Sequence, residues 1–447
     1  MANTYLTNTN PTAGNRTKGT ISVWFKRSGL GSYQHLYTEH YDGNNFGSLR
    51  LNNSDTLSFL SYDGGSAQAD IGTTRVFRDT NSWYHVVASW DTTNGTASDR
   101  VKIYINGVRE TSFSGSPTYP SSSQNIYFGV GGTSYPIRVG SISNSAQFFD
   151  GSMSHFHRVD NQALAQTVFG STDSVTGEWN INTSPSITYT GSSSFNFFIL
   201  KDGNSVTDQS GQSNNLTVGG GTLTKTEDCP SNVFATINLL DNFYNGLTIT
   251  NGNTSWVSGS PYSVTRSTLG ASSGKYYFEM KVVNEGNTDY EFGIVGAAGT
   301  STSSWMGSSG SYGYSYESNA ELRANGTTVD PWGSTYDDGD ILGCAFDLDN
   351  NKIYFSKNGS WQESGNPSAG SNGYTIVAAA DTPAGAYFVG AGDFSGSSGQ
   401  SGQFNFGNGY FGTTAVSSAG SNASNNGIFE YDVPTGYTAL STKGLNL

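Results

Sequence analysis

The feature that most constrains the fold is an alternation of apolar and polar residues with a period of two, which recurs along the chain. In the segment 20–27, Ile21, Val23 and Phe25 occupy every second position, and the segment 274–283 shows the same period. Successive side chains of a β-strand point to opposite faces, so this period predicts strands with one buried face. Such strands bury that face against a second sheet, which predicts β-sandwiches.

Turn signals separate these predicted strands. Asn106-Gly107 and Asn358-Gly359 each follow an alternating segment, and both central residues of a type I′ turn need the positive φ that Asn and Gly tolerate. The chain has 58 Gly, 26 Tyr and 25 Phe among 447 residues, which is typical of many short strands joined by tight turns. In the first half, only the segment 161–169 has the pattern of a short helix. The predicted fold class is therefore all-β, with two antiparallel β-sandwich (jelly-roll) domains in tandem.

The length of the chain suits two such domains. Residues 171–235 are rich in Ser, Gly and Asn and end in a Pro-containing turn signal. We place the domain boundary at this turn signal, which gives domains of residues 1–227 and 228–447. Cys229 and Cys344 lie in different segments, so we expect two free thiols, with Cys344 buried in a strand.

Charge and hydropathy exclude several kinds of partner. Lys and Arg number 21 against 35 Asp and Glu, a net charge of −14 without a basic cluster, which disfavours nucleic acid. No run of 18 apolar residues occurs, so membrane insertion is not expected. Residues 1–4 lack the basic and apolar regions of a signal peptide. We therefore expect synthesis and assembly in a cytoplasm, without export by the general route.

Neither a catalytic pair nor a metal site is evident from residue spacing. Glycoside hydrolysis needs two carboxylates across a cleft, and the nearest acidic group, Glu285, Asp289 and Glu291, lacks the spacing for it. His155 and His157 are two residues apart and would share a strand face, which we interpret as a structural pair. We therefore expect no enzymatic activity.

Four segments of the first half follow one another in a characteristic order: GTISVWFKR (19–27), SWYHVVASWD (82–91), VKIYINGVR (101–109) and FDGSMSHFHRVDNQAL (149–164). This series resembles the concanavalin A-like, laminin-G-type jelly roll, which implies a lectin-like sandwich. Laminin-G-type modules often hold calcium at one rim through loop oxygens, and hard oxygen ligands suit that ion. The resemblance thus implies calcium as the one candidate cofactor, with the candidate ligands Asp63, Asp91, Asp99 and Asn106.

The second half contains a comparable series: GKYYFEMKV (274–282), YEFGIV (290–295), GDILGCAFDLDNNKIYFSKNG (339–359) and FNFG (404–407). It resembles the SPRY domain, which implies partner-binding loops in the region 299–338. Large rings gather in this region and favour a ligand-binding surface formed by Trp305, Tyr312, Tyr314, Tyr316, Trp332 and Tyr336. The alternation of Tyr312, Tyr314 and Tyr316 also fits the core face of a single strand.

Two further phrases, DCPSNVFATINLLDN (228–242) and FEYDVPTGYTAL (429–440), resemble segments that join such modules in virion proteins of tailed phages, especially marine ones. This resemblance implies a location at the virion surface. It implies other virion proteins, a host cell-surface glycan or receptor, and further copies of the chain as partners.

The leading functional hypothesis is a non-enzymatic structural protein of the phage virion surface, associated with a tail fibre or binding a receptor. Its lectin-like modules would contact host surface glycans or proteins during adsorption. One alternative is a capsid or tail decoration protein that binds neighbouring virion subunits. The other is a glycan depolymerase.

Overall fold

A computed structural model describes residues 3–143, 146–201, 205–244, 246–259, 263–286, 290–296, 305–393 and 399–446. The chain divides into two compact units, Met1–Lys225 and Thr226–Leu447, each with its own hydrophobic core. Strands predominate in the described ranges, where helix is confined to short 3₁₀ turns, which confirms the all-β prediction. No helix in these ranges is long and apolar enough to cross a membrane.

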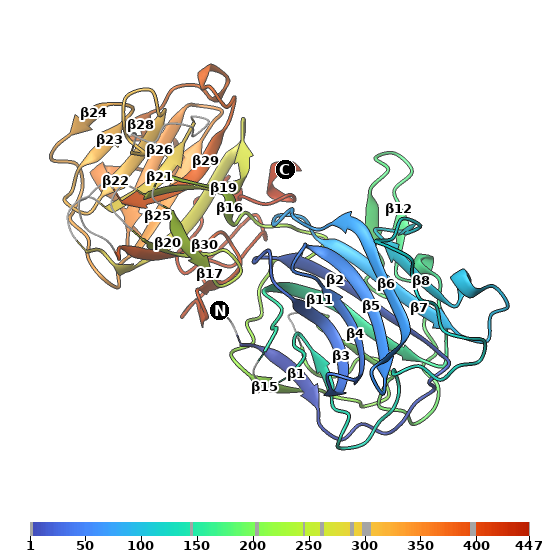
Figure 1. The fold of residues 1–447 in the computed structure, drawn as a ribbon. Coiled ribbons are helices and arrows are strands. Elements are labelled where there is room, and N and C mark those ends of the chain that lie inside the picture. Colours follow the sequence, from blue (N-terminus) through green and yellow to red (C-terminus); the bar gives the residue numbers. More distant parts are fainter. Residues whose placement is uncertain are drawn as a thin grey trace. The chain divides into compact units, whose positions relative to one another are not determined.

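The first unit is a sandwich of two antiparallel sheets, coloured blue to green in Figure 1. Its first sheet contains β1 (Tyr5–Asn8), β3 (Gln34–Asp42), β4 (Asn45–Leu51), β5 (Thr56–Asp63), β6 (Ser66–Val76), β10 (Ile137–Val139) and β15 (Thr217–Gly220). These strands lie in the order β15-β1-β10-β3-β4-β5-β6. The consecutive strands β3 to β6 are therefore neighbours that extend to one edge of the sheet.

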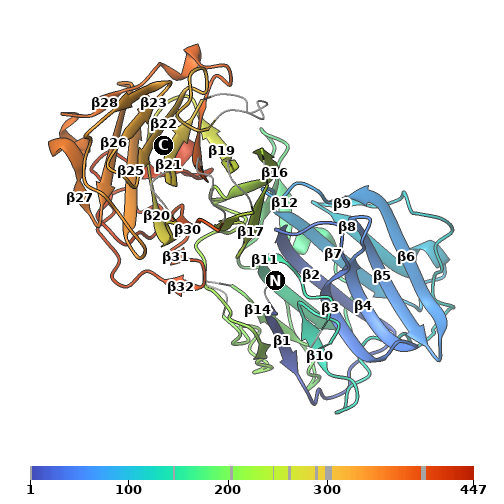
Figure 2. The ribbon, with the colours of Figure 1, turned by 60° about the vertical axis from the view of Figure 1, so that its left-hand side comes forward.

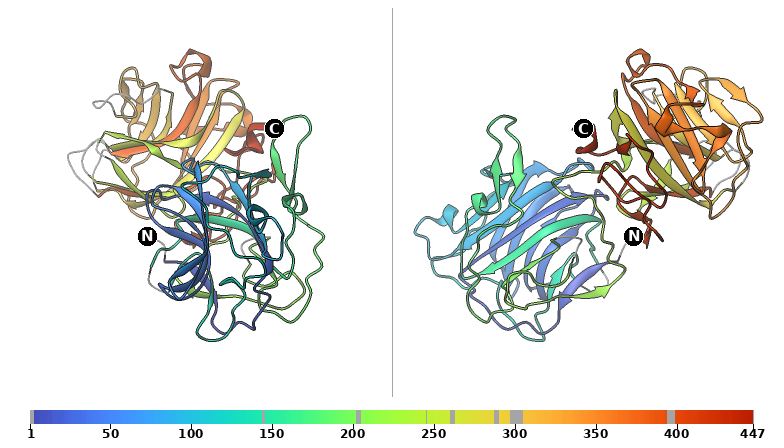
Figure 3. Two further views of the ribbon diagram at one scale, coloured as in Figure 1. Left: turned by 45° about the vertical axis from the view of Figure 1, so that its right-hand side comes forward. Right: turned by 180° about the vertical axis from the view of Figure 1, so that it is seen from behind.

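The second sheet of this unit contains β2 (Lys18–Arg27), β7 (Tyr84–Asp91), β8 (Val101–Ile105), β9 (Val108–Arg109), β11 (Gly151–Asp160) and β14 (Phe197–Ile199). Their order is β14-β11-β2-β7-β8-β9. A separate two-stranded ribbon joins β12 (Gly170–Thr172) to β13 (Trp179–Ile181). Figure 3 shows the two layers of this sandwich from two further sides.

The strand faces predicted for the first unit are confirmed. Ile21, Val23 and Phe25 of β2 are fully buried and belong to the core between the two sheets. Asn106 and Gly107 join β8 to β9 with φ values of 46° and 78°, the positive pair that a type I′ turn requires.

The predicted helix at 161–169 is wrong apart from one 3₁₀ turn, Gln166–Val168. The Thr20 hydroxyl donates to the Gln162 carbonyl at 2.7 Å and accepts the Leu164 N–H at 2.8 Å. A side chain of the neighbouring strand therefore takes backbone groups that helical hydrogen bonds would otherwise use.

The second unit is also a sandwich. Its first sheet contains β16 (Ile237–Tyr244), β19 (Ser263–Ala271), β21 (Tyr290–Val295), β22 (Gly313–Glu317), β23 (Leu322–Ala324), β24 (Thr327–Val329) and β29 (Tyr387–Asp393). Their order is β16-β19-β29-β21-β22-β23-β24.

The second sheet of this unit contains β17 (Leu247–Thr250), β18 (Ser255–Ser258), β20 (Lys275–Asn284), β25 (Ile341–Asp347), β26 (Lys352–Lys357), β27 (Ser360–Trp361) and β30 (Ser401–Asn405). Their order is β17-β18-β30-β20-β25-β26-β27, and Figure 2 shows β20, β25, β26 and β27 side by side. Off this path, β28 (Tyr374–Thr375) pairs with β26 and β33 (Thr438–Ala439) with β20. A short ribbon joins β31 (Tyr410–Phe411) to β32 (Thr414–Ala415).

The cysteine prediction is confirmed. Cys344 is a buried residue of β25, Cys229 is half-buried, and both are free thiols. Cys344 shares the core with its alternating neighbours Leu342 and Phe346, as the period of two predicted.

The C-terminal segment, residues 417–440, covers part of the outer face of the second sheet of this unit. Phe429, Val433 and Tyr437 pack there against Tyr277 of β20 and Tyr354 of β26, in a small cluster separate from the main core. A sheet that would otherwise expose one face to water is therefore covered on both sides at this position.

Candidate functional site

Most of the aromatic surface predicted in the second unit is part of the core. Tyr314, Tyr316, Trp332 and Tyr336 have exposed fractions of 3%, 0%, 8% and 4%. The ring of Tyr316 lies between those of Trp332 and Tyr336, at centroid distances of 5.3 and 5.0 Å. The prediction that these four rings bind a ligand is wrong, because β22 turns Tyr314 and Tyr316 inward, as the alternative interpretation required.

The other two predicted rings, Trp305 and Tyr312, are half-buried. Tyr312 directly precedes β22 and has a φ of 52°, which is not a strand conformation. Its ring therefore does not continue the inward face of that strand. Residues 297–304, in the same predicted loop region, lie outside the described residues. The structure therefore does not bring the six rings together as one surface.

The four candidate calcium ligands do not converge. Asp91 and Asn106 lie at opposite ends of the β7–β8 ladder, because the Asp91 N–H donates to the Arg100 carbonyl and the Asn106 N–H to that of His85. Asp91 instead pairs with Lys18 at 2.9 Å, and Asp99 with Arg109 at 2.7 Å. Asp63 lies in the other sheet, at the end of β5. In the described parts of the chain, no group of three or more His, Cys, Asp or Glu side chains could hold a metal ion.

The two histidines of β11 do not form a regular pair on one strand face. His155 has a φ of 47°, at a β-bulge between Ser154 and His157. The His157 ring stacks on Phe198 with centroids 3.8 Å apart, and its Nδ1 lies 2.8 Å from the Tyr189 hydroxyl. Both side chains are buried, and their aromatic contacts give them a packing role.

The acidic residues considered for catalysis have different hydrogen-bond partners. Glu291 is fully buried, and its carboxylate accepts the Met306 N–H at 3.1 Å. Glu285 accepts the Ser318 hydroxyl at 2.5 Å. Asp289 lies outside the described residues. Glu291 therefore has a structural role, in which it fixes the start of the 305–312 loop.

A hollow of about 590 Å³ lies on the outer face of the first sheet of the first unit. The strand register assembles it, since Phe46 of β4 is opposite Tyr62 of β5, and Leu60 of β5 is opposite Asp70 of β6. The intervening residues, such as Phe59, point into the core. The floor of the hollow is thus formed by the outward-facing side chains of β4, β5 and β6, which alternate with the core residues.

An aromatic platform and a set of fixed polar groups form this hollow. The rings of Phe46 and Tyr62 stack with centroids 5.1 Å apart and 11° between their planes. The Arg50 guanidinium lies 4.7 Å from the centroid of the Tyr33 ring, and its Nε donates to Asn52 Oδ1 at 3.2 Å. The stacked rings therefore lie beside a held cation and its amide partner.

Hydrogen bonds hold the other polar groups of the hollow in place. Asn52 donates to the hydroxyls of Thr56 and Ser58 at 3.0 and 2.8 Å. The Tyr62 hydroxyl donates to Asp70 Oδ2 at 2.6 Å, and this bond, together with burial, raises the pKa of Tyr62 to about 12. The arrangement can receive a ligand that has both an apolar face and several hydroxyl groups.

The residues of this hollow were not predicted from the sequence. The available signal was the second face of the segment 45–63, where Phe46, Arg50 and Tyr62 alternate with the inward residues. The pattern shows that these side chains face outward, but only the strand register brings them together.

The comparisons with known families agree with this architecture. Residues 1–169 match the laminin-G-type model of the concanavalin A-like lectin/glucanases superfamily, and residues 275–409 match the SPRY domain. The chain therefore contains a concanavalin A-like, laminin-G-type domain followed by a SPRY domain, as its motifs indicated.

Individual relatives are similar over short stretches. Ran-binding proteins 9 and 10 of Danio rerio are 34% and 36% identical over 90 residues, which is 20% of this chain and 15% of each of those proteins. Human Ran-binding protein 9 is 36% identical over 90 residues, 20% of this chain and 12% of that protein. The chain thus spans 15% or less of the length of these curated relatives.

Two solved structures are also similar. The SPRY domain of human HERC1 is 18% identical with a TM-score of 0.29, and the match covers 38% of this chain and 96% of that one. The SAP-like pentraxin of Limulus polyphemus is 15% identical with a TM-score of 0.30, and the match covers 49% of this chain and 89% of that one.

Proposed function

We propose that the chain is a non-enzymatic binding and display protein, and that the hollow on its first unit binds a saccharide of a cell surface. The observation that carries this proposal is the stacked pair Phe46 and Tyr62 beside Arg50, Asn52 and Asp70. A sugar ring has an apolar face that suits the aromatic platform, and its hydroxyls suit the fixed polar groups at the edge.

The small number of carboxylates in the hollow favours binding of a saccharide over its hydrolysis. Among the described residues that line it, Asp70 is the one carboxylate, and the Tyr62 hydroxyl already donates to it. Glycoside hydrolysis uses two carboxylates on either side of the scissile bond. A depolymerase would therefore need a second carboxylate from another part of the protein.

The setting we propose is the surface of a phage virion, where the two modules would contact the host during adsorption. The segments 228–242 and 429–440 support this setting through their resemblance to linking segments of phage virion proteins. A decoration role on the capsid or tail is the second candidate, since the SPRY domain adds a second module for contacts with other subunits.

Binding of the full chain to a panel of bacterial surface polysaccharides tests this proposal by calorimetry. We expect a saccharide ligand, and about 30-fold weaker binding for Phe46→Ala, since an aromatic anchor contributes on the order of 2 kcal/mol. Tyr41→Ala is the matched control, because Tyr41 is a 54% exposed ring of the same unit that does not line the hollow.

Three other outcomes would overturn the proposal. Release of reducing ends would identify a depolymerase. Binding only to purified virion subunits would identify a decoration protein. Equal loss of affinity in Tyr41→Ala and Phe46→Ala would place the saccharide outside the hollow.

A further inference from the structure

We propose that a pocket on the outer face of the second unit binds an arginine side chain of a protein partner. The pocket has a volume of about 510 Å³ and lies between the second sheet of this unit and the segment 418–432. It belongs to a different unit from the saccharide hollow, so the two proposals can fail independently.

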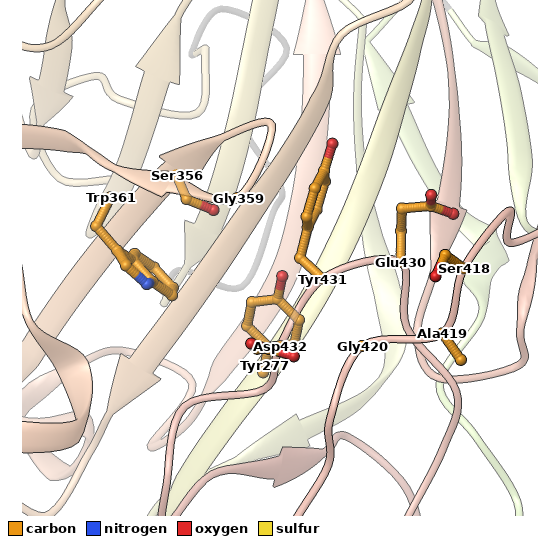
Figure 4. Close-up of a pocket in the computed structure, with 10 residues that line it drawn as sticks. All are labelled: Tyr277, Ser356, Gly359, Trp361, Ser418, Ala419, Gly420, Glu430, Tyr431 and Asp432. Carbon is orange, nitrogen blue, oxygen red and sulfur yellow. The ribbon is translucent and has the colours of Figure 1, made fainter.

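Three aromatic rings surround the space of this pocket. Tyr277 comes from β20, Trp361 from β27 and Tyr431 from the C-terminal segment. Figure 4 shows Trp361 and Tyr431 on either side, with Tyr277 between them. The rings of Tyr277 and Trp361 meet edge to face with centroids 6.3 Å apart. Aromatic faces carry negative charge density, which attracts a cation.

The backbone of the pocket wall is fixed by hydrogen bonds to a buried carboxylate. Both oxygens of the fully buried Glu279 carboxylate accept backbone N–H groups, from Tyr431 and Glu430, each at 2.9 Å. The Tyr431 ring packs against Gly359, whose φ is 77°, and a Cβ there would lie 2.7 Å from the ring. The ring of Tyr431 is therefore held in place before any ligand arrives.

Two carboxylates stand at the edge of the pocket. The Glu430 carboxylate accepts the Ser417 N–H at 2.6 Å and the Ser417 hydroxyl. Asp432 Oδ1 accepts the N–H and the hydroxyl of Ser421 at 2.6 and 2.8 Å, and these bonds hold the pKa of Asp432 below its usual value. Both Ser421 contacts fall on one oxygen of Asp432, so its Oδ2 faces no donor among the described residues.

A buried hydroxyl also lines the pocket without a protein partner. Ser356 is 1% exposed, and in the described part of the chain its Oγ forms no hydrogen bond. Buried hydroxyls are almost always hydrogen-bonded, so this oxygen is available to a donor group of a ligand. In the view of Figure 4 it lies between Trp361 and Tyr431.

The charge of the pocket selects the kind of ligand. Glu430 and Asp432 contribute two negative charges, and none of the ten described lining residues is Lys or Arg. A guanidinium group is planar, is weakly hydrated, stacks on aromatic rings and binds carboxylates with two parallel hydrogen bonds. It therefore satisfies the rings, the carboxylates and the Ser356 hydroxyl together, whereas a neutral sugar would leave both charges uncompensated.

Calorimetry on the full chain with capped Gly-Arg-Gly peptide tests this assignment. The control is the same peptide with citrulline, which has nearly the same shape without the charge. We expect the arginine peptide to bind at least about tenfold more tightly, because a charge-assisted hydrogen bond contributes on the order of 1.5–3 kcal/mol. Asp432→Asn should weaken arginine binding by about tenfold and leave citrulline binding unchanged, and Trp361→Ala should weaken both.

Asp381→Asn is the matched control variant, because it removes the same charge from an exposed site of the same unit that does not line the pocket. Near-UV circular dichroism identifies any variant that fails to fold. If Trp361→Ala fails to fold, Asp432→Asn alone tests the proposal, because Asp432 is at an exposed position. Equal affinity for arginine and citrulline peptides, or equal effects of Asp432→Asn and Asp381→Asn, would overturn the proposal. So would a lysine peptide that binds as tightly as arginine, or a saccharide whose binding is lost in Trp361→Ala.

Discussion

The carboxylate of Glu279 accepts the backbone N–H of Tyr431 at 2.9 Å, across 152 residues of the chain. It also accepts the Glu430 N–H, the Tyr277 hydroxyl at 3.0 Å and the Asn405 side chain at 3.3 Å. This buried acid on β20 thus binds the C-terminal segment to the sheet, in addition to the pairing of β33 with β20. All four groups around it are donors, so the site is built for a residue with two acceptor atoms.

Glu279→Gln should loosen the C-terminal segment selectively. The glutamine would direct an NH₂ group at donors that the carboxylate now accepts, and an unsatisfied buried donor costs about 1–3 kcal/mol. Hydrogen exchange should accelerate in residues 417–433 more than in β25, which lies in the same sheet. Uniform acceleration across the second unit would show that Glu279 supports the whole fold and not this segment in particular.

Glu291 should make the stability of the second unit decrease as pH rises. Burial, and then the charge of Glu317 directly opposite on β22, raise the pKa of Glu291 to about 8, against an ordinary value of 4.5. Between these values the folded state binds more protons than the unfolded state. The free energy of unfolding therefore falls with rising pH, by up to about 1.4 kcal/mol per pH unit.

Denaturant titrations of the wild type and Glu291→Gln between pH 6 and 9 measure this effect. Burial also raises the pKa of the Glu279 carboxyl, to about 7, so both acids contribute to the slope below pH 7 and mainly Glu291 contributes between pH 7 and 8. The variant should therefore show a shallower slope below pH 8 and lose most of the slope between pH 7 and 8. Parallel curves for the two proteins would contradict the prediction.

The first unit should lose stability in acid through its buried histidines. Burial lowers the pKa of His85 to about 3, against an ordinary value of 6.5. Its Nδ1 accepts the Trp179 indole N–H at 2.9 Å, and its Nε2 lies 2.8 Å from the Ser22 hydroxyl, so the ring is held neutral. The unfolded state takes up the proton first, so stability present above pH 6.5 is lost as pH falls toward 3.

Tryptophan fluorescence during acid titration follows this loss, since Trp179 reports on the His85 contact. His85→Gln should be less stable at pH 7 and should show a shallower loss between pH 6 and 4. An unchanged pH dependence in that variant would assign the acid sensitivity to other groups.

Trp332→Ala should destabilise the second unit by about 3–5 kcal/mol, the usual cost of truncating a large buried aromatic side chain. Trp332 packs edge to face against Tyr316 and Phe355, at centroid distances of 5.3 and 5.7 Å. Tyr312→Ala should cost clearly less, because that ring is half-buried. Thermal denaturation measures the unfolding midpoints of the two variants. Equal midpoints would show that Trp332 does not belong to the core.

The elements that were predicted well are those in which a local rule acts alone. The period of two in β2, β20 and β25 fixes which side chains face the core, and the Asn-Gly pairs at 106–107 and 358–359 fix their turns. The prediction failed at 161–169, where the hydroxyl of Thr20 binds backbone groups that a helix would pair. It also failed for Trp332, because nothing in a Gly- and Ser-rich sequence shows which loop folds back over the core.

The sequence by itself determined the all-β class, the strand faces, the turns and the two family resemblances, because each depends on residues close together in the chain. The tertiary structure decided which side chains meet. Phe46 and Tyr62 become a platform through the register of two strands, and Tyr277, Trp361 and Tyr431 meet only because the C-terminal segment is tied to β20. Register and segment docking depend on contacts between distant residues, and local periodicity carries no information about such contacts.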